Sequence, residues 1–157
     1  MFYIDPIYFK KWKYDDVTLA TQCSANHLHH VIMLAQRWSG PISVAVFGPN
    51  QEAAFASDAM ISMGECWPQV KNRVTFHLVY PTNHPADLTL ATGSGLDYQD
   101  CDQLLQLIHT YGGDDSNNYK GEIPYPHNVL RNVARRGSAT SHVFLIDVDV
   151  MPSLNMR

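Results

Sequence analysis

The sequence has 157 residues, a formal net charge of −4 and a hydrophobic content of 45%. These values predict one folded domain and exclude a disordered chain. The surplus of acidic residues argues against a nucleic-acid partner, because no large basic field is available to meet phosphates. No apolar run is long enough to span a bilayer, and residues 1–16 show no signal-peptide core or membrane anchor.

Short β-branched runs alternate with amphipathic stretches, which predicts an α/β domain with a mostly parallel sheet. The expected strands are Val17–Cys23, Ile42–Phe47, Val74–Val79 and His142–Val150. The expected helices run from Ser24 to the Ser39-Gly40-Pro41 stop, over Gln51–Cys66, over Cys101–Tyr111, and from Pro126 to Gly137.

Apolar residues at helical spacing predict the buried face of each helix. In chain order they are Leu28, Val31, Ile32 and Ala35; Ala53, Ala54, Ala56, Met60 and Met63; Leu104, Leu105 and Ile108; and Val129, Leu130 and Val133.

Ligands of parallel sheets usually lie beyond the carboxyl ends of the strands. Four short segments follow the predicted strands and are therefore candidate ligand positions. They are Thr21–Ser24, Phe47–Asn50, Tyr80–Asn83 and Asp147–Asp149.

The strongest chemical signal is the pair Asp147 and Asp149, which follows the apolar run Val143–Ile146. On an extended backbone, residues two apart point to the same side. Two carboxylates so placed repel each other, and a hard cation such as Mn²⁺ or Mg²⁺ relieves that repulsion. The alternative is a strand end at which both acids are simply hydrated.

The segment before this strand adds context. Tyr125–Asn132, YPHNVLRN, followed by the Asp147-Val148-Asp149 triplet, resembles the YPxNxLRN and DxD motifs of glycosyltransferase family 49. Val17–Gln22 and Ile42–Phe47 are similar to the first two strands of that family, and the resemblance extends from Asp16 to Ser153.

The resemblance implies a GT-A, Rossmann-like fold, of which this chain is the nucleotide-sugar-binding half. Residues 1–157 are then a single partial domain, with an N-terminal extension (1–16) and a donor-binding half (17–153) that is incomplete after the DxD. The family's general base and acceptor site follow the DxD, so neither is placed in this chain.

The family also implies transfer of a sugar, usually glucuronate, from a UDP-sugar to a glycan acceptor, with inversion and with Mn²⁺ or Mg²⁺. It implies a xylose-ended O-mannosyl glycan as acceptor, a role in glycoprotein biosynthesis, and the lumenal face of the Golgi membrane. The site residues carried over are Asp147 and Asp149 for the metal, and Thr21, Gln22, Asn128 and Arg131 for the donor.

Several alternatives stay open from the sequence. Arg131 also fits a solvated ion pair with a nearby acid, and Asn128 fits a role in holding a loop. The whole chain also fits a catalytically incomplete fragment or pseudoenzyme that only binds nucleotide. A DxD phosphatase is disfavoured, because almost nothing follows Asp149 that completes such a site.

Two residue types give no site by themselves. His27, His29 and His30 lack an obvious acidic partner and are interpreted as ordinary helix-surface histidines. The three cysteines form no CxxC pair, so zinc is not indicated, and their spacing does not settle a disulfide. The oligomeric state is not determined by the sequence.

Overall fold

The computed structural model describes residues 2–4, 12–111, 123–154 and 156. In chain order its elements are β1 (Phe2–Ile4), β2 (Val17–Ser24), η2 (Ala25–His27), α1 (His29–Arg37), β3 (Ile42–Phe47), α2 (Glu52–Cys66), α3 (Pro68–Arg73), β4 (Val74–Val79), α4 (Cys101–Thr110), α5 (His127–Arg136) and β5 (His142–Leu145).

In the described ranges the strands form one sheet in the order β1-β4-β3-β2-β5. Strands β4, β3, β2 and β5 are all parallel, and β1 pairs antiparallel with β4 at one edge. This confirms the prediction of an α/β domain with a mostly parallel sheet, and the arrangement is consistent with a Rossmann-like GT-A half.

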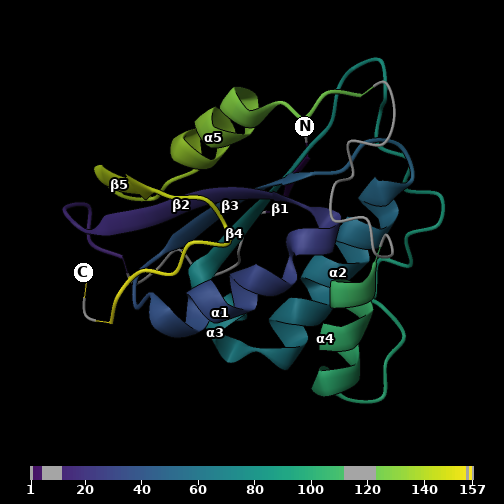
Figure 1. The fold of residues 1–157 in the computed structure, drawn as a ribbon, viewed down its shortest axis with the longest axis horizontal. Coiled ribbons are helices and arrows are strands. Elements are labelled where there is room, and N and C mark those ends of the chain that lie inside the picture. The colour runs from purple at the N-terminus through teal and green to yellow at the C-terminus, as the bar shows by residue number, and fades with distance from the viewer. Residues whose placement is uncertain (1, 5–11, 112–122, 155, 157) are drawn as a thin grey trace.

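Helices cover both faces of this sheet. Helix α5 lies on one face, and α1 to α4 lie on the other (Figure 1). Every residue of β3 and β4 is buried, as expected for central strands that are covered on both sides. The smaller apolar core lies under α5 and consists of Ala20, Ala45, Phe47, Val79, Leu130 and Ala134.

Most predicted elements agree with the structure. The bounds of β3 and β4 are as predicted, and those of β2, α2, α4 and α5 differ by about one residue at an end. The helix expected after Ser24 begins instead as the short η2 turn and continues as α1 from His29. Strand β1 and helix α3 were not predicted.

Two predicted core positions are wrong. Leu105 is 38% exposed and Val129 is 52% exposed. Helices α4 and α5 each bury only a narrow stripe of residues four apart, Leu104 with Ile108 and Leu130 with Ala134. A residue next to that stripe in sequence therefore points away from the core.

The last strand is shorter and more exposed than predicted. Strand β5 ends at Leu145 rather than at Val150, and the Leu145 side chain is 44% exposed. In the described part of the chain β5 lies at an edge of the sheet, with β2 as its one neighbour. The apolar run Val143–Ile146 is therefore half-buried, not a fully buried strand.

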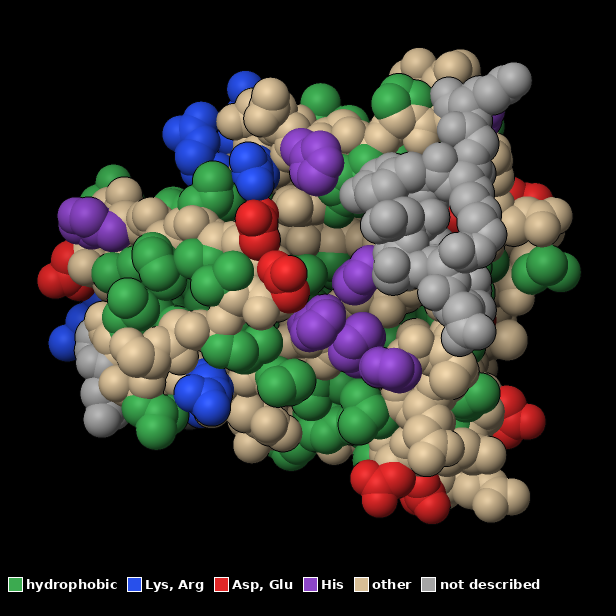
Figure 2. Space-filling view, in the orientation of Figure 1, with side chains coloured by type: hydrophobic (Ala, Val, Ile, Leu, Met, Phe, Trp, Pro, Cys, Tyr) green, Lys and Arg blue, Asp and Glu red, His purple; other side chains and the backbone are tan. Residues whose placement is uncertain are grey.

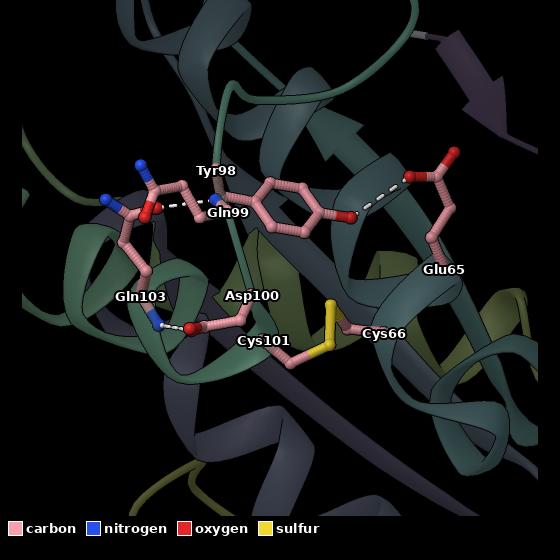
Figure 3. The surroundings of a disulfide bond; sticks show 7 residues. All are labelled: Glu65, Cys66, Tyr98, Gln99, Asp100, Cys101 and Gln103. Carbon is pink, nitrogen blue, oxygen red and sulfur yellow. Dashed lines mark hydrogen bonds between the residues drawn. A yellow bond between two sulfur atoms is a disulfide. The ribbon is translucent and has the colours of Figure 1, made fainter.

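A disulfide joins Cys66, at the end of α2, to Cys101, at the start of α4 (Figure 3). The turn into α4 is further fixed by Asp100, whose side chain accepts a hydrogen bond from the Gln103 backbone N–H at 2.8 Å. The Tyr98 hydroxyl donates to Glu65 on α2 at 3.2 Å. These contacts hold α4 against α2.

None of the helices in the described part of the chain is long and apolar enough to cross a membrane.

Candidate functional site

A cavity of about 310 Å³ lies at the carboxyl ends of β2 and β5. These strands are parallel neighbours, with Ala20 beside Leu145, so the segments that follow them meet at one edge of the sheet. Helix α5 forms one wall, and η2 with the start of α1 forms the other. The lining residues are Gln22, Cys23, Ser24, His27, His30, Tyr125, His127, Arg131, Asp147, Val148 and Asp149.

The acidic triplet lies in a turn rather than on a strand. Ile146 N–H still donates to the Ala20 carbonyl at 3.1 Å, but Val150 N–H donates to the Asp147 carbonyl at 3.0 Å. Val148, only 8% exposed, packs into the larger core. Asp147 and Asp149 therefore do not lie on an extended backbone, and that part of the prediction is wrong. The turn nevertheless places both residues on the wall of one cavity at the end of β5.

Arg131 brings a positive charge to this wall. Its Nη2 donates to Asp147 Oδ1 at 2.8 Å, with the two side chains 40% and 51% exposed. The ion pair expected as an alternative is therefore present, and Arg131 lines the cavity as well. Buried Leu130 and Ala134 fix the position of α5, so the backbone of Arg131 is held by packing rather than by this ion pair.

Gln22 reaches the cavity because side chains alternate along β2. Ala20 belongs to the core under α5, and Gln22 lies on that same face, 7% exposed. The Tyr125 hydroxyl donates to Gln22 Oε1. Tyr125 in turn packs edge-on against Phe47, with ring centroids 5.3 Å apart. The Gln22 carboxamide is therefore held in place, and its NH₂ group remains as a donor.

Two other predicted donor residues do not reach the cavity. Thr21 is fully buried on the opposite face of β2, and no hydrogen-bond partner reaches its hydroxyl among the described residues. Asn128 is exposed on the first turn of α5 and does not line the cavity.

The interpretation of the histidines as lacking an acidic partner is wrong. His27 and His30 line the cavity, and the charge of Asp149 acts on both of them. Figure 2 shows histidine side chains gathered beside acidic ones near the centre of this face, with basic side chains next to the acids. About 120 residues separate the two groups in sequence, so only the folded chain reveals this proximity.

Burial and the neighbouring histidines lower the pKa of these imidazoles. Desolvation is the main cause that lowers the pKa of His27 and of His30, and Asp149 opposes this in both. Burial, then the charges of His30 and His109, lower the pKa of His29 to about 4.

Cys23 lies at the floor of the cavity as an unreactive thiol. It is the free cysteine among the described residues, and it is 2% exposed. Burial raises the pKa of this thiol to about 12, so it stays protonated at neutral pH. A protonated, buried thiol is a poor nucleophile.

The residues present fit a cation only with help from a ligand. In the part of the chain that the structure describes, no three His, Cys, Asp or Glu side chains converge closely enough to hold a metal ion. Asp147 and Asp149 supply two hard oxygen ligands, which suits Mg²⁺ or Mn²⁺ when further oxygens come from a bound phosphate. Two carboxylates therefore fit such a cation only together with a ligand that supplies further oxygen atoms.

The segment Ile123–Val129 separates this cavity from a second one of about 340 Å³. Tyr125 and His127 face the first cavity, whereas Ile123, Pro124, Pro126 and Val129 face the second. Tyr80, Pro81 and Asn83 line the second cavity, so one of the four predicted strand-end segments opens onto it, whereas Thr21–Ser24 and Asp147–Asp149 share the first cavity. Phe47–Asn50 lines neither.

Comparison with known proteins decides the family. The model of glycosyltransferase family 49, described as "Glycosyl-transferase for dystroglycan", matches residues 16–157. The chain belongs to this family. The match includes β2, α5 and the acidic turn that form the cavity.

Individual relatives agree with this. The chain is 34% identical over 146 residues to beta-1,4-glucuronyltransferase 1 of Danio rerio, covering 90% of this chain and 34% of the relative. It is 33% identical over 143 residues to the Homo sapiens protein of that name, covering 88% and 34%. It is also 27% identical over 154 residues to xylosyl- and glucuronyltransferase LARGE2s of Danio rerio, covering 93% and 15%. The chain thus spans about one third of the length of the first two relatives and 15% of the length of the third.

Sequence reasoning missed several lining residues. Tyr125 and His127 belong to the YPHNVLRN segment on which the family resemblance rests, so the motif itself pointed to them. The cluster that includes His27 and His30 is visible in the sequence, but the sequence does not reveal that Asp149 lies near it. The family assignment further disfavours the phosphatase alternative.

Proposed function

We propose that this chain forms the donor-binding half of a cation-dependent glycosyltransferase that moves glucuronate from UDP-glucuronate to a glycan, with inversion. One observation carries the proposal: in a chain of this family, Asp147, Asp149, Arg131 and Gln22 meet in one cavity at the carboxyl end of a parallel sheet. The relatives named as glucuronyltransferases support glucuronate as the sugar.

Asp147 and Asp149 would hold Mn²⁺ or Mg²⁺ against the donor diphosphate. When bound, such a cation neutralises charge that builds on the departing nucleotide diphosphate. The two carboxylates orient the donor by fixing where its phosphate oxygens lie. Because only two protein ligands are in place, the diphosphate itself completes the coordination shell.

Arg131 and Gln22 would recognise the rest of the donor. The Arg131 guanidinium is a planar fork that matches phosphate or carboxylate oxygens, and it reaches the cavity from α5. Gln22, held by Tyr125, presents its NH₂ group to carbonyl or hydroxyl oxygens of the nucleoside. Thr21 would support this strand from its other face rather than touch the donor.

The acceptor and the compartment are part of the same proposal. We take the acceptor to be a xylose-ended O-mannosyl glycan and the compartment to be the Golgi lumen. The Cys66–Cys101 disulfide supports an oxidising compartment, because such bonds rarely persist in the cytosol.

A donor panel tests the sugar. UDP-glucuronate, UDP-xylose and UDP would be titrated into the chain with Mn²⁺ present, since glucuronate and xylose differ by a carboxylate on an otherwise equivalent ring. We expect UDP-glucuronate to bind at least about tenfold more tightly than UDP-xylose, as a charge-assisted hydrogen bond contributes about 1.5–3 kcal/mol. Equal affinities would contradict glucuronate as the donor sugar.

Transfer is a separate measurement. The chain would be incubated with UDP-glucuronate, Mn²⁺ and a xylose-ended acceptor, and the product detected by mass spectrometry. Product formation supports a complete enzyme. Donor binding without product supports the alternative that this chain only binds nucleotide.

A further inference from the structure

The Arg131–Asp147 ion pair has a consequence for how a cation and a donor bind together. Arg131 Nη2 lies 2.8 Å from Asp147 Oδ1, and both side chains are about half exposed. The backbone beneath each is fixed, on one side by α5 and on the other by the turn around buried Val148. The two side chains are therefore free to exchange partners while the elements that carry them stay in place.

The two carboxylates of the turn differ in their surroundings. Asp147 accepts a hydrogen bond from a guanidinium, whereas no hydrogen bond reaches the carboxylate of Asp149 from the described residues. A divalent cation that binds Asp147 lies close to the guanidinium charge and must compete with it for the same carboxylate. The same guanidinium attracts the anionic groups of a donor.

We propose that Arg131 and the divalent cation compete for Asp147, and that the donor resolves this competition by drawing Arg131 onto its own anionic oxygens. Arg131 then opposes the binding of the cation alone and favours the binding of the donor. This inference rests on the proposed function, because it assumes a cation and a phosphorylated donor in one cavity.

Thermodynamic linkage follows from this exchange. If the donor removes Arg131 from Asp147, the donor strengthens cation binding, and the cation strengthens donor binding by the same factor. If Arg131 instead only orients Asp147 for the cation, the effect has the opposite sign: loss of Arg131 then weakens cation binding. The sign of one measurement therefore separates the two roles.

The test is Arg131→Gln, compared with wild type and with Arg135→Gln. Arg135 lies one turn further along α5, is exposed and does not line the cavity, so its substitution removes the same charge without touching the pair. Free Mn²⁺ would be measured by electron paramagnetic resonance during titration of each protein, without nucleotide. UDP would then be titrated calorimetrically at saturating Mn²⁺.

We expect Arg131→Gln to bind Mn²⁺ alone about threefold to tenfold more tightly than wild type, and UDP about tenfold more weakly, on the scale of one charge-assisted hydrogen bond. Arg135→Gln should match wild type in both titrations. Unchanged or weaker Mn²⁺ binding by Arg131→Gln would overturn the inference, as would an equal change in Arg135→Gln.

The two proposals fail separately. A wild-type chain that binds no UDP at any Mn²⁺ concentration contradicts the proposed function, whatever the Mn²⁺ titration shows. If wild type binds UDP normally but Arg131→Gln does not bind Mn²⁺ more tightly than wild type, only the competition between Arg131 and the cation is overturned. Comparing UDP with UDP-glucuronate on Arg131→Gln shows whether Arg131 binds the diphosphate alone, in which case both lose affinity equally, or the sugar carboxylate as well, in which case UDP-glucuronate loses more.

Discussion

Among the single residues of the site, Tyr125 connects the segment before α5 to the strands of the sheet. Its hydroxyl donates to Gln22 Oε1, and its ring packs against Phe47 at the end of β3. Phenylalanine keeps the ring and its packing but cannot hold the carboxamide. Gln22 then has more orientations available, and its NH₂ group is less often directed at a ligand.

We therefore expect Tyr125→Phe to weaken Mn²⁺-dependent UDP binding about fivefold, the equivalent of one hydrogen bond worth about 1 kcal/mol. Calorimetric titration measures this effect. Tyr98→Phe is the matched control, because the Tyr98 hydroxyl bonds Glu65 away from the cavity. If both variants bind UDP like wild type, Tyr125 does not position Gln22 for the ligand.

His29 makes folding depend on pH. In the folded chain its pKa falls from 6.5 to about 4, through burial first and then through the charges of His30 and His109. The unfolded chain therefore binds more protons between these values, so this histidine's contribution to stability is complete above pH 6.5 and is lost as the pH falls. The side chain is only partly buried, which limits the size of the effect.

We expect the free energy of unfolding in urea to fall between pH 7.5 and pH 5 by a larger amount in wild type than in His29→Gln. Carboxylates titrate in both proteins, so the difference between them isolates this imidazole. An equal fall in the two proteins would show that His29 does not carry the dependence.

At the scale of elements, the disulfide fixes one wall of the site indirectly. Cys66 and Cys101 are 35 residues apart and tie α4 to α2, and α4 packs against η2, which carries His27. Closing a loop of this length restricts the unfolded chain and stabilises the fold by about 2–4 kcal/mol. Helix α4 and the cavity wall next to it depend on this link.

Reduction should therefore lower the melting temperature, and a Cys66→Ser/Cys101→Ser variant should melt at the reduced value whether or not reductant is present. Differential scanning calorimetry with and without dithiothreitol measures both. Cys23 is a free thiol, so it contributes no reductant-sensitive bond. A melting temperature unchanged by reduction would contradict a stabilising role for the disulfide.

The ends of some strands can be predicted from the sequence, and those of others cannot. Strands β3 (ISVAVF) and β4 (VTFHLV) are short runs rich in β-branched and aromatic residues, and their bounds follow directly from the sequence. The end of β5 does not, because Val148 and Val150 extend the apolar pattern, and the turn depends on a backbone hydrogen bond from Val150 to Asp147 that no Gly or Pro announces. Strand β1 has only three residues and pairs antiparallel with β4, a contact distant in sequence that a run of three residues does not reveal.

Contacts distant in sequence were beyond prediction from patterns. Asp147 and Asp149 were recognised as a pair, but their approach to His27 and His30 depends on β5 pairing with β2. The Cys66–Cys101 pairing likewise depends on how α4 docks on α2, which the spacing of three cysteines does not reveal. Arg131 and Gln22, which the family resemblance put forward as donor residues, both line the cavity.

For the whole molecule, the parallel sheet brings two strand ends together and α5 closes the space between them. The family assignment rests on residues 16–157, and the chain corresponds to about one third of the glucuronyltransferases it resembles. We propose that this part of the family's fold forms a cation-dependent nucleotide site at the Asp147–Asp149 turn. Asp149 is the residue to replace, because it lines the cavity and, unlike Asp147, is not in the ion pair with Arg131.

One measurement tests this claim most directly: calorimetric titration of UDP into wild type, Asp149→Asn and Asp102→Asn, each with and without Mn²⁺. Asp102 is an exposed acid on α4 outside the cavity, so Asp102→Asn controls for the loss of one charge. We expect wild type and Asp102→Asn to bind UDP only with Mn²⁺, and Asp149→Asn to lose at least about tenfold of this affinity, since it removes one of two protein ligands of the cation. UDP binding that is independent of Mn²⁺, or unchanged in Asp149→Asn, would contradict it.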